Sequence, residues 1–140
     1  MHMVLKKEQY LNKQIIGLLI VLLVTMFSLG GCSQSYDEHV QMVRNGTMNM
    51  RPNVPVGEAF DQFFKDGEWK YFEATDHSKV VEFSGKCSWE GKTATATIQF
   101  IITGDKSFQL GHTDINGVSL NKLESTAMVE KVLESYHKKK

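Results

Sequence analysis

The stretch VEFSGKCSWEGKTATATIQFII, residues 81–102, decides the fold of this chain. Apolar and polar residues alternate along each half, as they do in strands that bury one face. A two-residue turn at Glu90 and Gly91 joins the halves so that both apolar sets share a face. The cross-strand pairs expected from this turn are Cys87 with Ala94, Gly85 with Ala96, Phe83 with Ile98 and Val81 with Phe100. The sequence therefore predicts an antiparallel hairpin with one apolar and one polar face.

Strands on either side extend this hairpin into a meander. After it, a loop of residues 104–106 keeps Phe108 on the apolar face, which a two-residue turn at this place would not do. Before it, a turn at Asp76 and His77 makes residues 69–74 the first strand. The pairs expected in these two hairpins are Ile102 with Phe108, Phe100 with Leu110, and Phe72 with Val81. We therefore expect a four-stranded antiparallel meander.

Three helical segments flank the predicted strands. The first follows the capping residue Asp37, the second spans residues 56–66, and the third spans residues 122–137 behind a cap formed by Asn121 and Glu124. Each carries apolar residues at helical spacing on one side, which must be covered by another element. The predicted fold class is therefore α+β, with helices packed on one face of the sheet.

The polar face of the predicted sheet is the candidate binding surface. It is rich in threonine and poor in aromatic residues, which is typical of a face that meets solvent. The residues selected as candidate binding residues on this face are Glu82, Ser84, Lys86, Thr95, Thr97 and Gln99. The loops at residues 76–79 and 104–106 are further candidates.

The first 32 residues resemble a bacterial lipoprotein signal. Lysines at positions 6, 7 and 13 precede an uncharged apolar run, residues 15–27, and the motif Leu29-Gly30-Gly31-Cys32 resembles a lipobox. This resemblance implies diacylglyceryl transfer to the Cys32 thiol and cleavage after Gly31. The alternative is an uncleaved transmembrane helix. The apolar run is shorter than the ~20 residues that a span needs and ends in Gly-Gly, which disfavours that alternative.

The lipoprotein resemblance divides the chain into three parts. Residues 1–31 are the expected signal peptide, residues 32–55 a lipidated tether with one short helix, and residues 56–140 an α+β domain. The expected location is the extracytoplasmic face of the cell membrane, reached through the lipid on Cys32. In an envelope with two membranes, Ser33 favours the outer one. Lipidation of Cys32 would leave Cys87 without a disulfide partner.

The remainder of the chain carries two further resemblances. The runs VRNGTM, residues 43–48, and VGEAFDQFF, residues 56–64, followed by Trp69, resemble a group of small bacterial lipoproteins. No activity is assigned to that group, so the resemblance implies a fold and a location only. The order of helices and strands is also similar to the β-lactamase-inhibitor-like fold, although Gly46-Thr47-Met48 reverses the Gly-Met-Thr order expected there. Fold likeness of this kind says little about function.

Charge and motif content exclude several functions. The 16 basic and 16 acidic residues balance, whereas a nucleic-acid-binding protein needs a basic face. The histidines are scattered, and no residue has a recognisable nucleophile context, so we expect no enzyme activity and no cofactor. His112-Thr113-Asp114 offers two potential metal ligands without a third, so no metal site is expected.

The predicted function is therefore non-catalytic binding by a membrane-anchored envelope lipoprotein. The favoured partner is another envelope protein, and an inhibitor or immunity-type lipoprotein is one specific version. The alternative is a small-ligand-binding lipoprotein with a pocket between the sheet and the carboxy-terminal helix.

Overall fold

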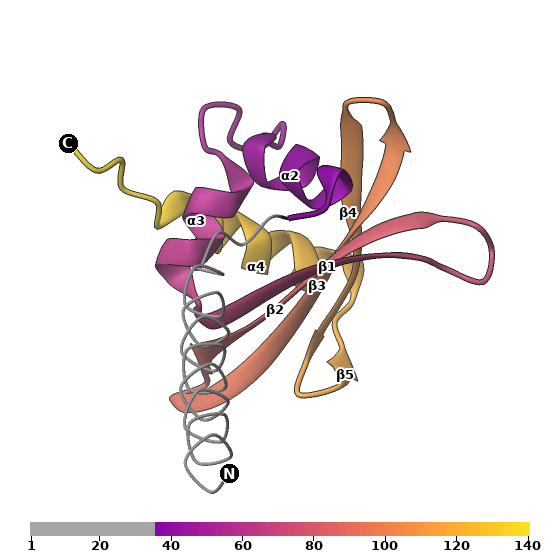
Figure 1. Cartoon of the computed structure of the whole chain (residues 1–140). Coiled ribbons are helices and arrows are strands. Elements are labelled where there is room, and N and C mark those ends of the chain that lie inside the picture. Colours follow the sequence, from indigo (N-terminus) through magenta and orange to yellow (C-terminus); the bar gives the residue numbers. More distant parts are fainter. Residues whose placement is uncertain (1–35) are drawn as a thin grey trace, which may run out of the picture. The chain divides into compact units, whose positions relative to one another are not determined.

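Five antiparallel strands in sequential order form one sheet in the computed structural model, which describes residues 36–140. The elements are α2 (Glu38–Asn45), α3 (Val56–Phe63), β1 (Lys65–Glu73), β2 (Lys79–Trp89), β3 (Lys92–Gly104), β4 (Ser107–Ile115), β5 (Val118–Ser119) and α4 (Lys122–Glu134). The predicted α+β class is confirmed (Figure 1). The sheet has five strands rather than four, because residues 118 and 119 pair with the end of β4. The predicted signal peptide and Cys32 lie outside the described residues.

The central hairpin has the predicted register. β2 and β3 pair through all four predicted residue pairs. Glu90 and Gly91 form the turn with φ angles of 49° and 77°. Two positive φ angles are the mark of a type I′ turn, whose twist matches that of the flanking strands. The local sequence was therefore sufficient to set this register.

The next hairpin also pairs as predicted, with Ile102 opposite Phe108 and Phe100 opposite Leu110. Its register shifts twice, once near the loop and once between Ile98 and Phe100, where β4 has one extra residue. The second shift is a β-bulge, which moves alternate side chains of β4 to the opposite face. Thr113 therefore faces the core instead of solvent.

The predicted register of the first hairpin is wrong by one residue. Phe72 pairs with Val80 and not with Val81, and Tyr71 takes the place opposite Val81. The loop has three residues because His77 adopts a left-handed conformation, with φ of 66°, and its N–H donates to the carbonyl of Ala74. A change of one residue moves every side chain of a strand to the other face. Phe72 consequently lies on the polar face of the sheet.

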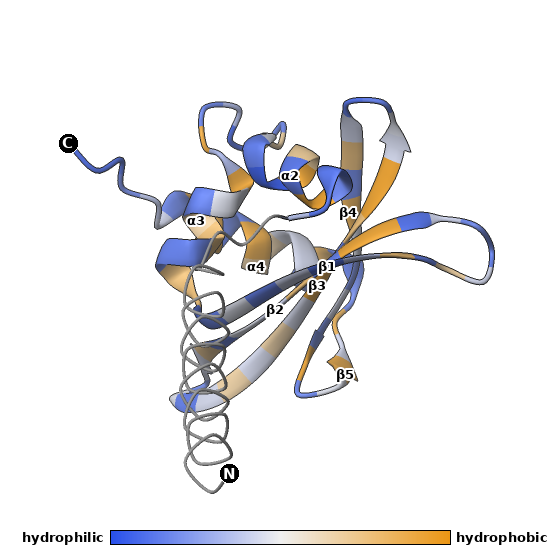
Figure 2. Ribbon diagram, in the orientation of Figure 1, coloured by the Kyte–Doolittle hydropathy of each residue, from blue (hydrophilic) through white to orange (hydrophobic). Residues whose placement is uncertain are grey.

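Phe60 lies at the centre of the core. Its ring centroid is within 5.0–5.7 Å of the ring centroids of four other aromatic residues, which are Phe64, Trp69, Phe83 and Phe100. Helices α2, α3 and α4 all contribute to the same cluster (Figure 1). The hydrophobic residues of each helix appear as orange bands among hydrophilic ones (Figure 2). One face of the sheet and the three helices therefore share one core.

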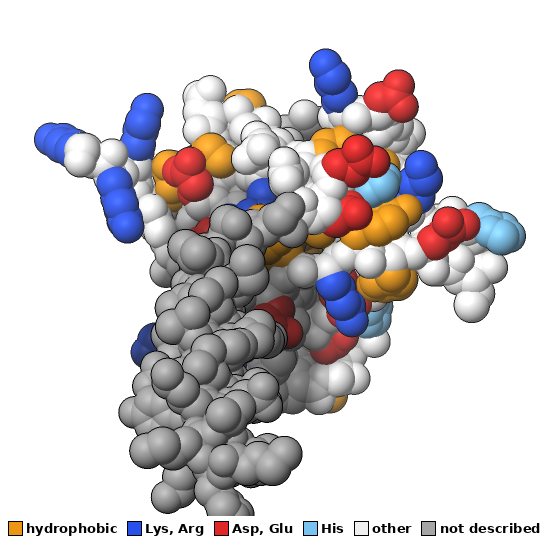
Figure 3. Space-filling view, viewed as in Figure 1, with side chains coloured by type: hydrophobic (Ala, Val, Ile, Leu, Met, Phe, Trp, Pro, Cys, Tyr) orange, Lys and Arg blue, Asp and Glu red, His pale blue; other side chains and the backbone are white. Residues whose placement is uncertain are grey.

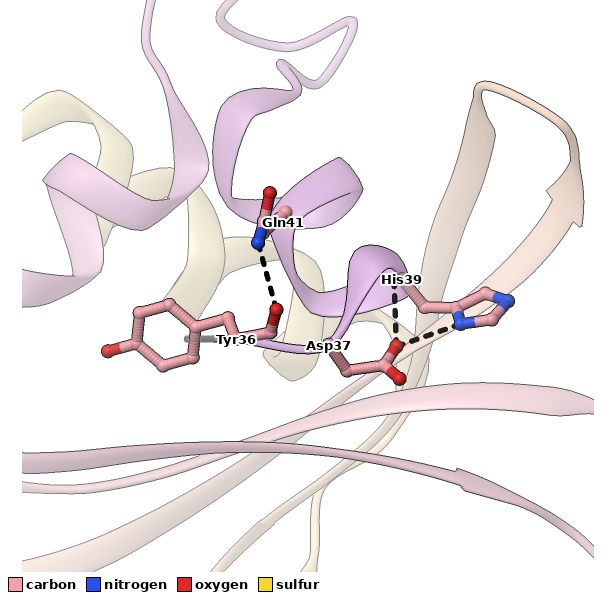
Figure 4. Close-up of polar contacts among 4 residues, drawn as sticks. All are labelled: Tyr36, Asp37, His39 and Gln41. Atoms are coloured by element: carbon pink, nitrogen blue, oxygen red, sulfur yellow. Dashed lines mark hydrogen bonds and ion pairs between the residues drawn. The ribbon is translucent and has the colours of Figure 1, made fainter. Parts of the chain in front are cut away.

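Helix α2 belongs to the folded unit and not to the predicted tether of residues 32–55. Its Val40 and Val43 are fully buried in the common core. The carboxylate of Asp37 caps the helix by accepting from the backbone N–H of His39, and it also bonds the imidazole ring of His39 (Figure 4). Gln41 donates to the carbonyl of Tyr36, 2.8 Å away (Figure 4). The folded unit therefore begins at residue 36.

The other two helices are shorter than predicted. Helix α3 ends at Phe63 instead of residue 66, because Phe64 turns into extended backbone that leads directly into β1. Helix α4 ends at Glu134 instead of residue 137. The predicted cap of α4 is confirmed, since Asn121 and Glu124 form a reciprocal capping box.

Candidate functional site

The six candidate binding residues lie together on the polar face of β2 and β3. They form three successive cross-strand pairs, which are Glu82 with Gln99, Ser84 with Thr97, and Lys86 with Thr95. We call the surface made by these six residues the outer face. Lys86 and Thr95 are exposed, and the other four residues are half-buried. The hairpin register thus brings all the selected residues into one continuous polar surface.

Glu82 organises one end of the outer face. Its carboxylate accepts from Gln99 at 2.7 Å and pairs with Lys70 on β1 at 2.8 Å. Its side chain is only 14% exposed. Burial raises the pKa of Glu82, but the hydrogen bonds from Lys70 and Gln99 lower the pKa by more, so it lies below its ordinary value. Glu82 therefore remains ionised and, through Lys70 and Gln99, connects side chains of β1, β2 and β3.

The pH dependence of stability should reveal the Glu82 interactions. A lowered pKa in the folded protein means that ionised Glu82 contributes stability above the ordinary pKa of 4.5, and that this contribution is lost as the pH falls. We expect the wild type to lose more stability than Glu82→Gln between about pH 6 and about pH 3, by less than about 1 kcal/mol because the network is partly solvated. Urea unfolding curves at several pH values measure this difference. Parallel pH profiles for the two proteins would contradict it.

An apolar strip adjoins the outer face, and the sequence analysis did not identify it. Phe72, Val80 and Ile101 are cross-strand neighbours on β1, β2 and β3, and Val80 is only 3% exposed. The Nζ atom of Lys70 lies 5.6 Å from the centroid of the Phe72 ring. The predicted register of the first hairpin placed Phe72 in the core, so the sequence pattern did not indicate this strip. A partner on the outer face would thus meet polar groups beside the half-buried side chains of Phe72 and Ile101, while Val80 lies beneath the surface.

The two candidate loops lie at the ends of hairpins near α2. Lys79 from the first hairpin and Asp105 from the β3–β4 turn line a hollow of about 330 Å³ together with Glu38, His39, Met42 and Ile102. Acidic, basic and histidine side chains are mixed over this part of the surface (Figure 3). The largest gathering of positive charge in this view is on the carboxy-terminal tail (Figure 3). The hollow therefore has no single sign of charge to select a ligand.

A pocket of about 310 Å³ lies between β4 and α4. Its lining residues are Leu110, Gly111, His112 and Thr113 from β4, Leu120 from the connection, and Lys122, Ser125 and Thr126 from α4. Thr113 is 1% exposed, and its hydroxyl has no hydrogen-bond partner among residues 36–140. This pocket lies where the small-ligand alternative requires one, between the sheet and the carboxy-terminal helix.

Two potential metal ligands lie close together near the end of β4. His112 and Asp114 are 3.4 Å apart, but no set of three potential ligands occurs among residues 36–140. Burial raises the pKa of the Cys87 thiol. A raised thiol pKa keeps Cys87 protonated and therefore weakly nucleophilic at neutral pH.

No protein-family model, curated protein or solved structure matches the chain. None of the helices in residues 36–140 has the length and apolarity needed to cross a bilayer.

Proposed function

We propose that this chain is an envelope lipoprotein, anchored through lipid on Cys32, whose folded unit binds another envelope protein through the outer face. The observation that carries this proposal is the alignment of the six polar candidate residues as three cross-strand pairs beside an apolar strip. Such a surface offers hydroxyl, amide and charged groups next to a small apolar area, which suits a protein partner. Inhibition or immunity would follow if the partner is an enzyme or a toxin.

The small number of residues between Cys32 and the folded unit supports a partner close to the membrane. Tyr36 is held in place, because its carbonyl accepts from Gln41 and its ring lies 4.7 Å from the guanidinium of Arg44. Arg44 is in turn paired with Asp61 on α3. Only residues 33–35 separate Cys32 from Tyr36, which is a reach of about 14 Å at full extension. A lipidated Cys32 would therefore keep the folded unit next to the bilayer.

A photo-crosslinker at Thr95 tests the outer face in intact cells of the native host. We expect one discrete protein adduct from benzoylphenylalanine at Thr95. Lys86 pairs with Asp66 at 3.2 Å, so Lys86→Glu sets two carboxylates side by side on this surface and should reduce the adduct about tenfold. The matched control is Glu130→Lys, a charge reversal on the exposed side of α4, which should leave the adduct unchanged.

Two results would contradict the outer-face proposal. One is the absence of an adduct from Thr95 in a folded, membrane-bound protein. The other is an adduct that Lys86→Glu does not reduce, because that adduct would not depend on the proposed surface.

A second candidate function is the binding of a small ligand. The observation that favours it is the pocket of about 310 Å³ between β4 and α4, whose volume is at the lower end of the range for small-molecule sites. Leucines from β4 and from the connection give it an apolar part, and Ser125 and Thr126 give it hydroxyl groups.

A further inference from the structure

We propose that the groove between β4 and α4 binds an extended, acidic peptide segment of a partner protein as an added strand of the sheet. We call this site the β4–α4 groove, defined by the residues that line the pocket of about 310 Å³. The β4–α4 groove is formed by different residues from the outer face. The second candidate function, small-ligand binding, uses the same pocket. A test must therefore distinguish a peptide that pairs with β4 from a ligand that only fills the pocket.

Most of the outward edge of β4 has no neighbouring strand among the described residues. β5 is the last strand of the sheet and pairs only with Asp114 and Ile115. The carbonyl of Thr113 is occupied, since it accepts from the backbone N–H of Leu120 at 2.9 Å. This leaves residues 107–112 as an open strand edge, and open edges are the sites where proteins add an extended peptide to a sheet.

The register of the sheet shows which backbone groups of this edge point outward. The Thr113 carbonyl points away from β3, and Thr113 lies opposite Ile98. Residues two apart on a regular strand direct their backbone N–H and C=O groups to the same side. The backbone groups of Phe100 and Ile102 therefore point away from β4, as those of Ile98 do. Their partners on β4 are Leu110 and Phe108 respectively. The N–H and C=O groups of Phe108 and Leu110 therefore point away from β3, and no backbone partner from residues 36–140 takes them up.

The pocket lies beside this open edge. Leu110 belongs both to the edge and to the pocket lining, while Lys122, Ser125 and Thr126 form the opposite wall. The wall residues are spaced by three and four positions, so they project from one side of α4. A peptide paired with Leu110 would direct alternate side chains toward the pocket, because successive side chains of a strand point to opposite faces. This arrangement combines main-chain pairing with side-chain selection.

The exposed apolar residues of the domain support the same location. Val118 and Leu123 are 69% and 80% exposed, and they are the two large hydrophobic residues with high exposure in the described part of the chain. Both belong to the segment that contains Leu120 and Lys122, which line the pocket. Exposed apolar side chains beside a groove are typical of a binding site. They would be covered by the apolar residues of a bound peptide.

The charge of the β4–α4 groove favours an acidic peptide. Lys122 contributes an ammonium group to the lining, and none of the described lining residues is a carboxylate, although the imidazole of His112 lies 3.4 Å from the carboxylate of Asp114. A peptide with Asp or Glu beside its apolar residues therefore gains a favourable interaction, whereas Lys or Arg in those positions would be repelled by Lys122.

Peptide binding to the full-length protein in lipid nanodiscs tests the proposal. The probe is a pool of fluorescein-labelled octapeptides with Val or Leu at alternate positions and Asp, Glu or Thr between them, measured by fluorescence anisotropy. We expect binding that Thr126→Trp weakens about tenfold or more, because the indole fills the groove. Ala127→Trp is the matched control, since Ala127 is exposed and is not a lining residue, and this variant should bind as the wild type does.

Backbone methylation of the same peptides separates strand addition from binding in the pocket alone. Successive N–H groups of a strand point to opposite sides, so one of the two alternating methylation patterns removes the donors that pair with the β4 edge and should abolish binding, whereas the other pattern should not. Equal binding of the unmodified peptides and of peptides with either methylation pattern would overturn the proposal in favour of a side-chain ligand. No binding by any peptide of the pool, or undiminished binding by Thr126→Trp, would also overturn it. Thr95→Arg should leave peptide binding unchanged, so failure at this groove is distinguishable from failure at the outer face.

Discussion

Replacing Phe60 by alanine is expected to lower the free energy of unfolding by about 3–5 kcal/mol. Phe60 is fully buried, and its ring contacts aromatic residues from β1, β2 and β3 as well as the residue after α3. Removing the ring leaves a cavity where the helices meet the sheet, and these neighbours cannot collapse into it together. Small domains are stable by only about 5–15 kcal/mol, so the loss is a large part of the total.

Urea unfolding of the full-length protein in detergent, followed by circular dichroism, measures this effect. Leu123→Ala is the control, because Leu123 is 80% exposed and its truncation should change stability by less than about 0.5 kcal/mol. A loss at Phe60 no larger than the loss at Leu123 would show that the aromatic cluster is not the centre of the core.

Replacing Cys32 by alanine should abolish maturation of the chain. In the proposed lipoprotein the Cys32 thiol receives the diacylglyceryl group before the signal peptide is cleaved, and alanine has no sulfur to receive it. We expect the wild type to have a mass that begins at diacylated Cys32, and Cys32→Ala to retain residues 1–31. Intact-mass measurement of the membrane fraction decides between these two forms.

Cys87→Ala provides the matched control for this experiment. Cys87 lies in β2, is half-buried and has no disulfide partner among the described residues, so its replacement should leave processing unchanged. An unmodified, uncleaved wild-type chain would contradict the lipid anchor and favour the alternative of a transmembrane segment. The outer face and the β4–α4 groove would remain testable in that case, because they belong to the folded unit.

Several parts of the fold could be predicted because their information is local. The turn at Glu90 and Gly91 fixes the central register, since Gly91 adopts positive φ without steric cost and the flanking alternation allows only one shared apolar face. The cap formed by Asn121 and Glu124 is likewise a short-range interaction. The six candidate residues of the outer face followed directly from this register.

Other parts depended on information that the local pattern does not carry. His77 takes a left-handed conformation, which the apolar and polar alternation does not indicate, and this added one residue to the first loop. The apolar strip around Phe72 followed from that change. The segment before residue 56 reads as a short amphipathic helix followed by prolines, and only its packing against α3 and the sheet makes it part of the core.

The α+β class, the central hairpin and the polar face follow from turn chemistry and side-chain alternation, which act between near neighbours along the chain. The end of the sheet and the surroundings of its last full strand depend instead on how distant segments pack together. The β4–α4 groove needs the bulge in β4, the short β5 strand and the placement of α4, and these bring together residues 110–113 and 120–126. Their proximity results from packing a helix against a sheet edge, a contact that neither segment specifies alone.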